Sequence, residues 1–102
     1  MSDDEYSRCK YSVTVHTDDL AVVHCLRALC EFAEGGVKGQ IGWGGTKRSE
    51  WEKAGNKITL RFSSPAFRTT FVEQAKRLLP VSSWREIARN DNDPAHRQRP
   101  PH

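Results

Sequence analysis

Two repeating patterns alternate along this chain, and their order restricts its fold more than any other feature. Tyr11–Thr17 alternates apolar and polar side chains, which is the two-residue period of a half-buried strand. Leu20–Glu34 then follows the period of a helix. The same succession returns over Lys57–Phe62 and over the segment from Pro65 to Pro80. Strand, helix, strand and helix in this order predict one domain of the mixed α and β class.

The apolar side chains of these segments predict which faces point into the core. The inward strand faces are expected to be Tyr11, Val13, Val15, Ile58, Leu60 and Phe62. The first helix should be largely buried, through an apolar arc that includes Val22, Leu26, Leu29 and Ala33. The second helix begins at a serine cap followed by proline, and its apolar stripe is Phe67, Phe71, Ala75 and Leu78.

The segment Gln40–Phe62 predicts a β-hairpin with a long connection. Gly39–Gly44 is a short strand candidate, and Gly55-Asn56 is a two-residue turn signal just before the strand that begins at Lys57. The partner of that strand is left open by the sequence. It is either Glu50–Ala54, or Gln40–Gly44 across a long loop, or both in one bent strand.

A last strand over Ser82–Arg89, anchored by Trp84, completes the order β-α-β-β-α-β. This order predicts an α+β, ferredoxin-like fold with a four-stranded antiparallel sheet and two helices on one face. The first and third strands are expected in its centre. The ends, residues 1–5 and 90–102, are polar and poor in large apolar side chains, so we expect them to be disordered around a single domain of residues 6–89.

Charge and cysteine content indicate a soluble cytoplasmic chain without a signal peptide or membrane span. No apolar run approaches the ~20 residues that cross a bilayer. The three cysteines, Cys9, Cys25 and Cys30, form no C-x-x-C pair and are expected to be buried thiols. The net charge of +3 divides into −4 for residues 1–36 (three basic, seven acidic) and +7 for residues 37–102 (thirteen basic, six acidic). This asymmetry indicates either a basic face for an anionic partner or two complementary halves.

Two neighbouring surfaces are the candidate binding site. The first is the basic hairpin that bears two tryptophans, with Trp43, Lys47, Arg48 and Trp51. Tryptophan and arginine are enriched at protein hot spots, and basic residues among aromatic rings also suit nucleic acid. The second is the open face of the sheet, whose alternation exposes His16 and Arg61, with Arg85 at the last strand. The alternative interpretation is that Trp43 lies in the core and Trp51 packs on its own hairpin.

No motif predicts catalysis, a cofactor or a metal site. The glycine-rich run GQIGWGGTK has threonine before lysine, the reverse of a phosphate-binding loop, and the histidines and cysteines lack zinc spacing. We therefore expect a non-enzymatic binding module that acts through protein–protein interaction, as an adaptor, an inhibitor or a homodimer. Nucleic-acid binding is the alternative. Lys57–Leu78 resembles part of the RNA-recognition motif, but the outward strand positions lack the aromatic residues that stack on bases.

Overall fold

A computed structural model of the chain describes residues 8–34 and 46–94. Its helices and strands are, in order, β1 (Tyr11–His16), α2 (Leu20–Glu34), α4 (Arg48–Lys53), β2 (Lys57–Phe62), α5 (Pro65–Leu78) and β3 (Arg85–Asn90). No helix within these described ranges is long and apolar enough to cross a membrane.

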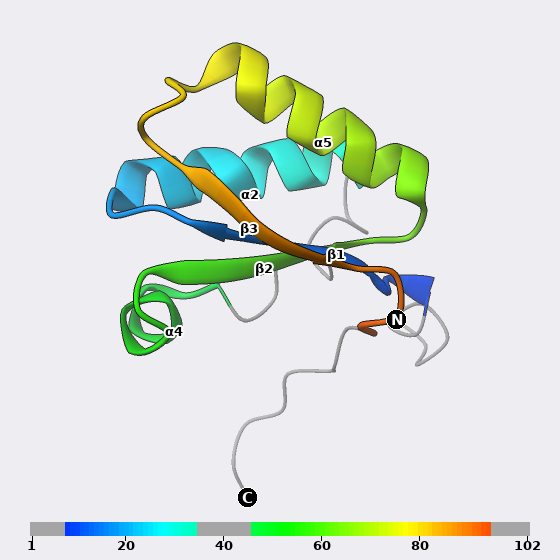
Figure 1. Cartoon of the computed structure of the whole chain (residues 1–102), viewed down its shortest axis with the longest axis horizontal. Helices are drawn as coiled ribbons and strands as arrows, with labels where there is room; N and C mark the ends of the chain where they lie inside the picture. Colours follow the sequence, from blue (N-terminus) through cyan, green and yellow to red (C-terminus); the bar gives the residue numbers. More distant parts are fainter. Residues whose placement is uncertain (1–7, 35–45, 95–102) are drawn as a thin grey trace, which may run out of the picture.

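Strand β1 is the centre of the sheet. The strand order is β2-β1-β3, and both neighbours run antiparallel to β1. Val13 of β1 faces Leu60 on one side and Arg89 on the other. Helices α2 and α5 lie together over one face of this sheet, whereas α4 lies at the end of β2 where that strand begins (Figure 1).

The expected four-stranded sheet with two helices is wrong. The described residues form a three-stranded sheet and three helices, and Glu50–Ala54, which we considered as a partner strand, falls in helix α4 and its end. The turn at Gly55-Asn56 does exist, with φ of 71° and 65°, but it terminates α4 instead of joining two strands. The Gly55 amide donates to the Glu52 carbonyl and the Asn56 amide to that of Trp51, as at many helix ends. The strand candidate Gly39–Gly44 lies outside the described residues.

The predicted inward faces of β1 and β2 are confirmed. Their fully buried members are Val13, Val15, Leu60 and Phe62, while Ile58 is also buried and Tyr11 is partly buried. The core forms between these strands and the two covering helices, where the rings of Phe62 and Phe71 lie 5.1 Å apart. The thiol prediction is only partly right, because Cys9 and Cys30 are buried but Cys25 is exposed.

The apolar stripe predicted for α5 is wrong at both ends. The helix buries Arg68, Phe71, Val72 and Ala75, while Phe67 and Leu78 are 39% and 57% exposed. The buried positions follow i, i+3, i+4 and i+7, so the inward face lies about one residue further along the helix than the aromatic spacing indicated. The sequence pattern fails because the first inward position of the helix is filled by Arg68, whereas we had assigned it to Phe67.

Arg68 is buried because its guanidinium meets acceptors at the edge between β1 and β3. Its Nη1 donates to the backbone carbonyls of Ser12 and Asn90, at 3.2 and 3.3 Å. Its Nη2 pairs with the Asp91 carboxylate at 2.7 Å. A buried charge is tolerated when hydrogen bonds and an opposite charge replace water, and both are present here.

Replacing Arg68 with methionine should lower the free energy of unfolding by about 1–3 kcal/mol, because two carbonyls lose their donor while the apolar stem is kept. Urea unfolding measures the change. Arg77→Met is the matched control, since Arg77 lies exposed on the same helix, and it should change stability by less than about 0.5 kcal/mol. Equal losses in the two variants would contradict the structural role of Arg68.

Candidate functional site

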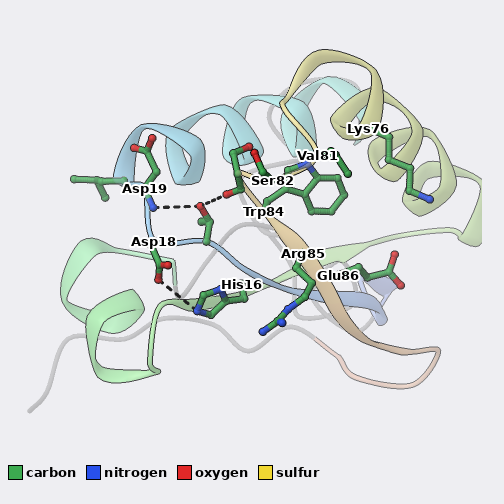
Figure 2. A pocket seen from close by; sticks show the side chains of 12 residues that line it. His16, Asp18, Asp19, Lys76, Val81, Ser82, Trp84, Arg85 and Glu86 are labelled. Atoms are coloured by element: carbon green, nitrogen blue, oxygen red, sulfur yellow. Dashed lines mark hydrogen bonds and ion pairs between the residues drawn. The ribbon is translucent and has the colours of Figure 1, made fainter.

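An open pocket of about 990 Å³ lies at the end of the sheet where β1 runs into α2. Residues 16–20 form one side of it and residues 81–86 form the other, with Lys76 of α5 at the rim (Figure 2). These segments are far apart in the sequence. They meet because β1 pairs with β3, so that the residues after β1 lie beside the residues that lead into β3.

Thr17 fixes the shape of this pocket, because each of its polar groups makes a hydrogen bond. Its hydroxyl donates to the Ser83 carbonyl at 2.7 Å and accepts from the Asp19 amide at 3.2 Å. Its amide donates to the Asn56 carbonyl at 3.1 Å, and its own carbonyl accepts the indole N–H of Trp51 at 2.9 Å. The threonine is 1% exposed. One residue therefore ties the start of α2 to α4, to the turn after it and to the segment before β3.

Apolar side chains contribute a hydrophobic part of the pocket lining. Trp84 is buried, Leu20 is half-buried, and Val81 is 92% exposed. The indole N–H of Trp84 has no hydrogen-bond partner among the described residues. Most buried donors are paired, so this donor is an unusual feature of the lining. A large exposed valine beside a buried indole is a favourable place for an apolar group of a ligand.

A β-bulge determines which charged groups of β3 face the helices. Val15 pairs with Glu86 and Thr14 with Ala88, so Ile87 is an extra residue opposite the shift between Thr14 and Val15. The extra residue puts Glu86 and Arg89 on the same face of the sheet, the one covered by α2 and α5. The two side chains form an ion pair there, with contacts of 2.6 and 3.0 Å. The hydrogen bond from Arg89 lowers the pKa of Glu86, and the same bond raises the pKa of Arg89.

Three basic side chains lie in a row across the opposite face of the sheet, the open face, which neither α2 nor α5 covers (Figure 1). His16 of β1 is directly paired with Lys57 of β2 and with Arg85 of β3. Thr14 and Thr59 form the next residue pair on this face, and their hydroxyls lie 2.9 Å apart. His16 also contacts the Asp18 carboxylate at 3.5 Å. The row therefore has one permanent positive charge on each side of a histidine, next to the pocket.

Two of the site residues predicted from the sequence lie together at the pocket. His16 and Arg85 are neighbours and both line the pocket (Figure 2). Arg61 is on the same face but at the far end of the sheet, opposite Ser12. It donates to the carbonyl and carboxylate of Asp93 at 2.9 to 3.2 Å. Arg61 therefore holds the segment after β3 in place.

The predicted hairpin surface is not assembled in the described part of the chain. Lys47 and Arg48 are exposed at the start of α4, where Arg48 pairs with Glu52 at 3.0 Å. Trp51 is only 7% exposed, so it serves as a core residue and cannot be an exposed anchor. Trp43 lies outside the described residues.

Sequence reasoning missed Lys57 and the pocket as a whole. Lys57 has the same parity as Thr59 and Arg61, so strict alternation could have assigned it to the open face. The pocket had no sequence signal, because it depends on how β1 and β3 pair. Trp84 was expected as an anchor of the last strand, and its burial agrees with that role.

Within residues 8–34 and 46–94, no group of three or more histidine, cysteine, aspartate or glutamate side chains is placed to hold a metal ion. Neither a protein family, nor a curated protein, nor a solved structure matches this chain significantly.

Thr17→Val should lower the free energy of unfolding by about 1–3 kcal/mol, because the Ser83 carbonyl and the Asp19 amide lose their partner in a buried place. Thermal or urea unfolding measures this loss. Thr69→Val is the control, since the Thr69 hydroxyl bonds only to the Pro65 carbonyl within its own exposed turn. A Thr17 variant as stable as that control would show that the hydroxyl does not hold the pocket together.

Arg89→Gln should raise the pKa of Glu86 toward its ordinary value, which an NMR titration of the carboxyl group measures. A lowered folded-state pKa stabilises the protein above the unfolded-state pKa, and this gain is lost as the pH falls through the folded-state value. The variant should therefore be less stable at neutral pH by about 0.2–1 kcal/mol, the size of a surface pair, and equal to the parent once Glu86 is protonated. Arg77→Gln removes the same charge elsewhere, and should leave the Glu86 pKa in place. An unchanged Glu86 pKa in the Arg89 variant would contradict the assignment.

Proposed function

We propose that this protein is a small, non-enzymatic, cytoplasmic binding module that takes a segment of a partner protein into the pocket beside Thr17. The observation that carries the proposal is the pocket lining. Val81 and Leu20 lie beside the buried Trp84, and charged side chains of both signs surround them. An apolar centre with a polar rim is the usual arrangement of a protein interface, and tryptophan is enriched at its energetic centre.

The volume and rigidity of the pocket support the same proposal. About 990 Å³ is enough space for a few side chains of a bound segment. The hydrogen bond from the Thr17 hydroxyl to the Ser83 carbonyl joins the two sides of the pocket before a partner arrives, and the other three bonds of Thr17 hold its own side in place. A preformed site loses less conformational entropy on binding than one that must be ordered by its ligand.

Nucleic-acid binding is the weaker alternative. Its strongest argument from the sequence was tryptophan among basic residues, but Trp51 is buried and is not available to stack on a base. The carboxylates of Asp18, Asp19 and Glu86 also line the pocket, so a nucleic-acid backbone with one charge per nucleotide, laid along it, would meet several negative charges in succession. These observations favour a protein segment over an extended polyanion.

A random-peptide display selection against the intact chain tests this function. Enriched peptides should shift the NMR signals of residues 16–20 and 81–86. Val81→Ser should weaken the binding of these peptides about tenfold, because it removes apolar contact area worth roughly 1.5 kcal/mol.

Phe32→Ser is the matched control for this experiment. Phe32 is also a large exposed apolar residue, at 69%, but it lies on α2 twelve residues beyond Leu20, roughly 18 Å along the helix. Its replacement should leave peptide affinity unchanged. The proposal fails if no peptide is enriched, if the shifts fall outside the pocket, or if the two variants lose affinity equally.

A further inference from the structure

The two outer cations of the basic row, Lys57 and Arg85, differ from two other arginines of the sheet, which pair with carboxylates. Arg61 on the same face pairs with Asp93, and Arg89 on the other face pairs with Glu86. In the described part of the chain, Lys57 and Arg85 take part in no ion pair within 4 Å. Both side chains lie directly beside His16 in the strand register. Two unneutralised cations that flank the same histidine repel one another, and an anionic ligand would relieve that repulsion.

The geometry of the row suits one compact anion with several oxygens. Neighbouring strands are about 4.8 Å apart, so Lys57 and Arg85 start about 10 Å from each other with His16 between them. Their long side chains can approach the same point above the histidine. The guanidinium offers a planar pair of donors and the ammonium offers a mobile one, a combination that matches phosphoryl oxygens. Figure 2 shows His16 and Arg85 extending on the same side of the sheet.

Charge complementarity decides between a phosphoryl group and a carboxylate. A phosphorylated side chain carries about −1.5 to −2 charges near neutral pH, and Lys57 with Arg85 supplies two permanent positive charges. A single carboxylate would neutralise only one of them. The Asp18 carboxylate, 3.5 Å from the Nε2 of His16, already occupies the histidine side of the row. The two outer cations therefore remain for the ligand.

We propose that the row of Lys57, His16 and Arg85 binds a phosphoserine or phosphothreonine side chain of the partner segment. His16 and Arg85 belong both to the row and to the pocket, so a bound segment can place its phosphoryl group on the row and a neighbouring apolar side chain against Val81. This inference rests on the proposed function, because it names the chemistry of the segment that the pocket receives.

The test uses NMR titration of the intact chain with small probes, so that it does not depend on any selected peptide. The probes are N-acetyl-phosphoserine amide, N-acetyl-glutamate amide and inorganic phosphate. The phosphoserine probe should give saturable shifts at His16, Lys57 and Arg85, with at least a fivefold higher affinity than the glutamate probe. Inorganic phosphate should bind at the same residues.

The double variant Lys57→Gln with Arg85→Gln should lower the affinity for the phosphoserine probe at least tenfold. The control is Arg8→Gln with Arg77→Gln, which removes the same charge from exposed side chains; Arg8 precedes the Tyr11 end of β1, away from His16, and Arg77 lies on α5, which covers the other face of the sheet (Figure 1). It should change the affinity less than twofold. Equal losses in both pairs would show general charge attraction and overturn the site, as would the absence of saturable shifts.

Two further outcomes separate this inference from its alternatives. A glutamate probe that binds as well as the phosphoserine probe would overturn the phosphoryl assignment. A twelve-residue oligothymidylate that binds through the same three residues more tightly than the phosphoserine probe would replace the protein segment with nucleic acid. If display peptides bind at Val81 while the phosphoserine probe does not bind, the pocket function stands and only the phosphoryl assignment fails.

Discussion

The four hydrogen bonds of Thr17 are the constraint on which the candidate site depends. They join four stretches of chain: the start of α2, the indole of Trp51 in α4, the turn at Asn56 and the residue before Trp84. A polar group buried to 1% exposure must be fully paired or it destabilises the fold. The chain therefore cannot rearrange at this corner without breaking several of these bonds together. Every polar group of Thr17 is paired, and these pairings hold the shape of the pocket.

The two ends of the sheet differ in how their charges are used. At the Ser12 end, Arg61 and Arg68 each pair with a carboxylate of the segment after β3, and the Asp93 amide donates to the Lys10 carbonyl. These contacts close that end of the sheet. At the His16 end, Lys57 and Arg85 are left beside an open pocket. The protein thus neutralises Arg61 and Arg68 internally and keeps two cations where a ligand can reach them.

Alternation along the strands predicted much of the core, because a strand residue faces in or out by parity alone. The inward faces of β1 and β2 follow from this rule, and so does the position of His16 on the open face. Helix α4 could not be predicted in the same way. Its six residues are too few to be stable alone, and its position depends on the bond from Trp51 to Thr17, 34 residues away in the sequence. The Gly55-Asn56 signal is shared by hairpins and by helix ends, so it could not decide between them.

The candidate site was predicted less well because it depends on pairing that no local pattern contains. His16 and Arg85 become neighbours through the register of β1 with β3, and the bulge at Ile87 changes the parity of the residues before it. The position of Arg68 follows from acceptors on three distant residues. Sequence periodicity describes one segment at a time. It cannot show which segments supply acceptors to one another.

The central position of β1 also has a consequence for synthesis. This strand comes off the ribosome before both of its partners, and β3 follows it by about 70 residues, or roughly 4 to 15 s at 5–20 residues per second. Val13 and Val15 have no strand to pair with until β2 is made, and after that one edge of β1 still carries unpaired backbone groups until β3 follows. The nascent chain is therefore exposed to wrong pairing and to chaperone capture until its last strand is made. Because β1 lies between β2 and β3, the sheet described here is complete only when β3 has been made.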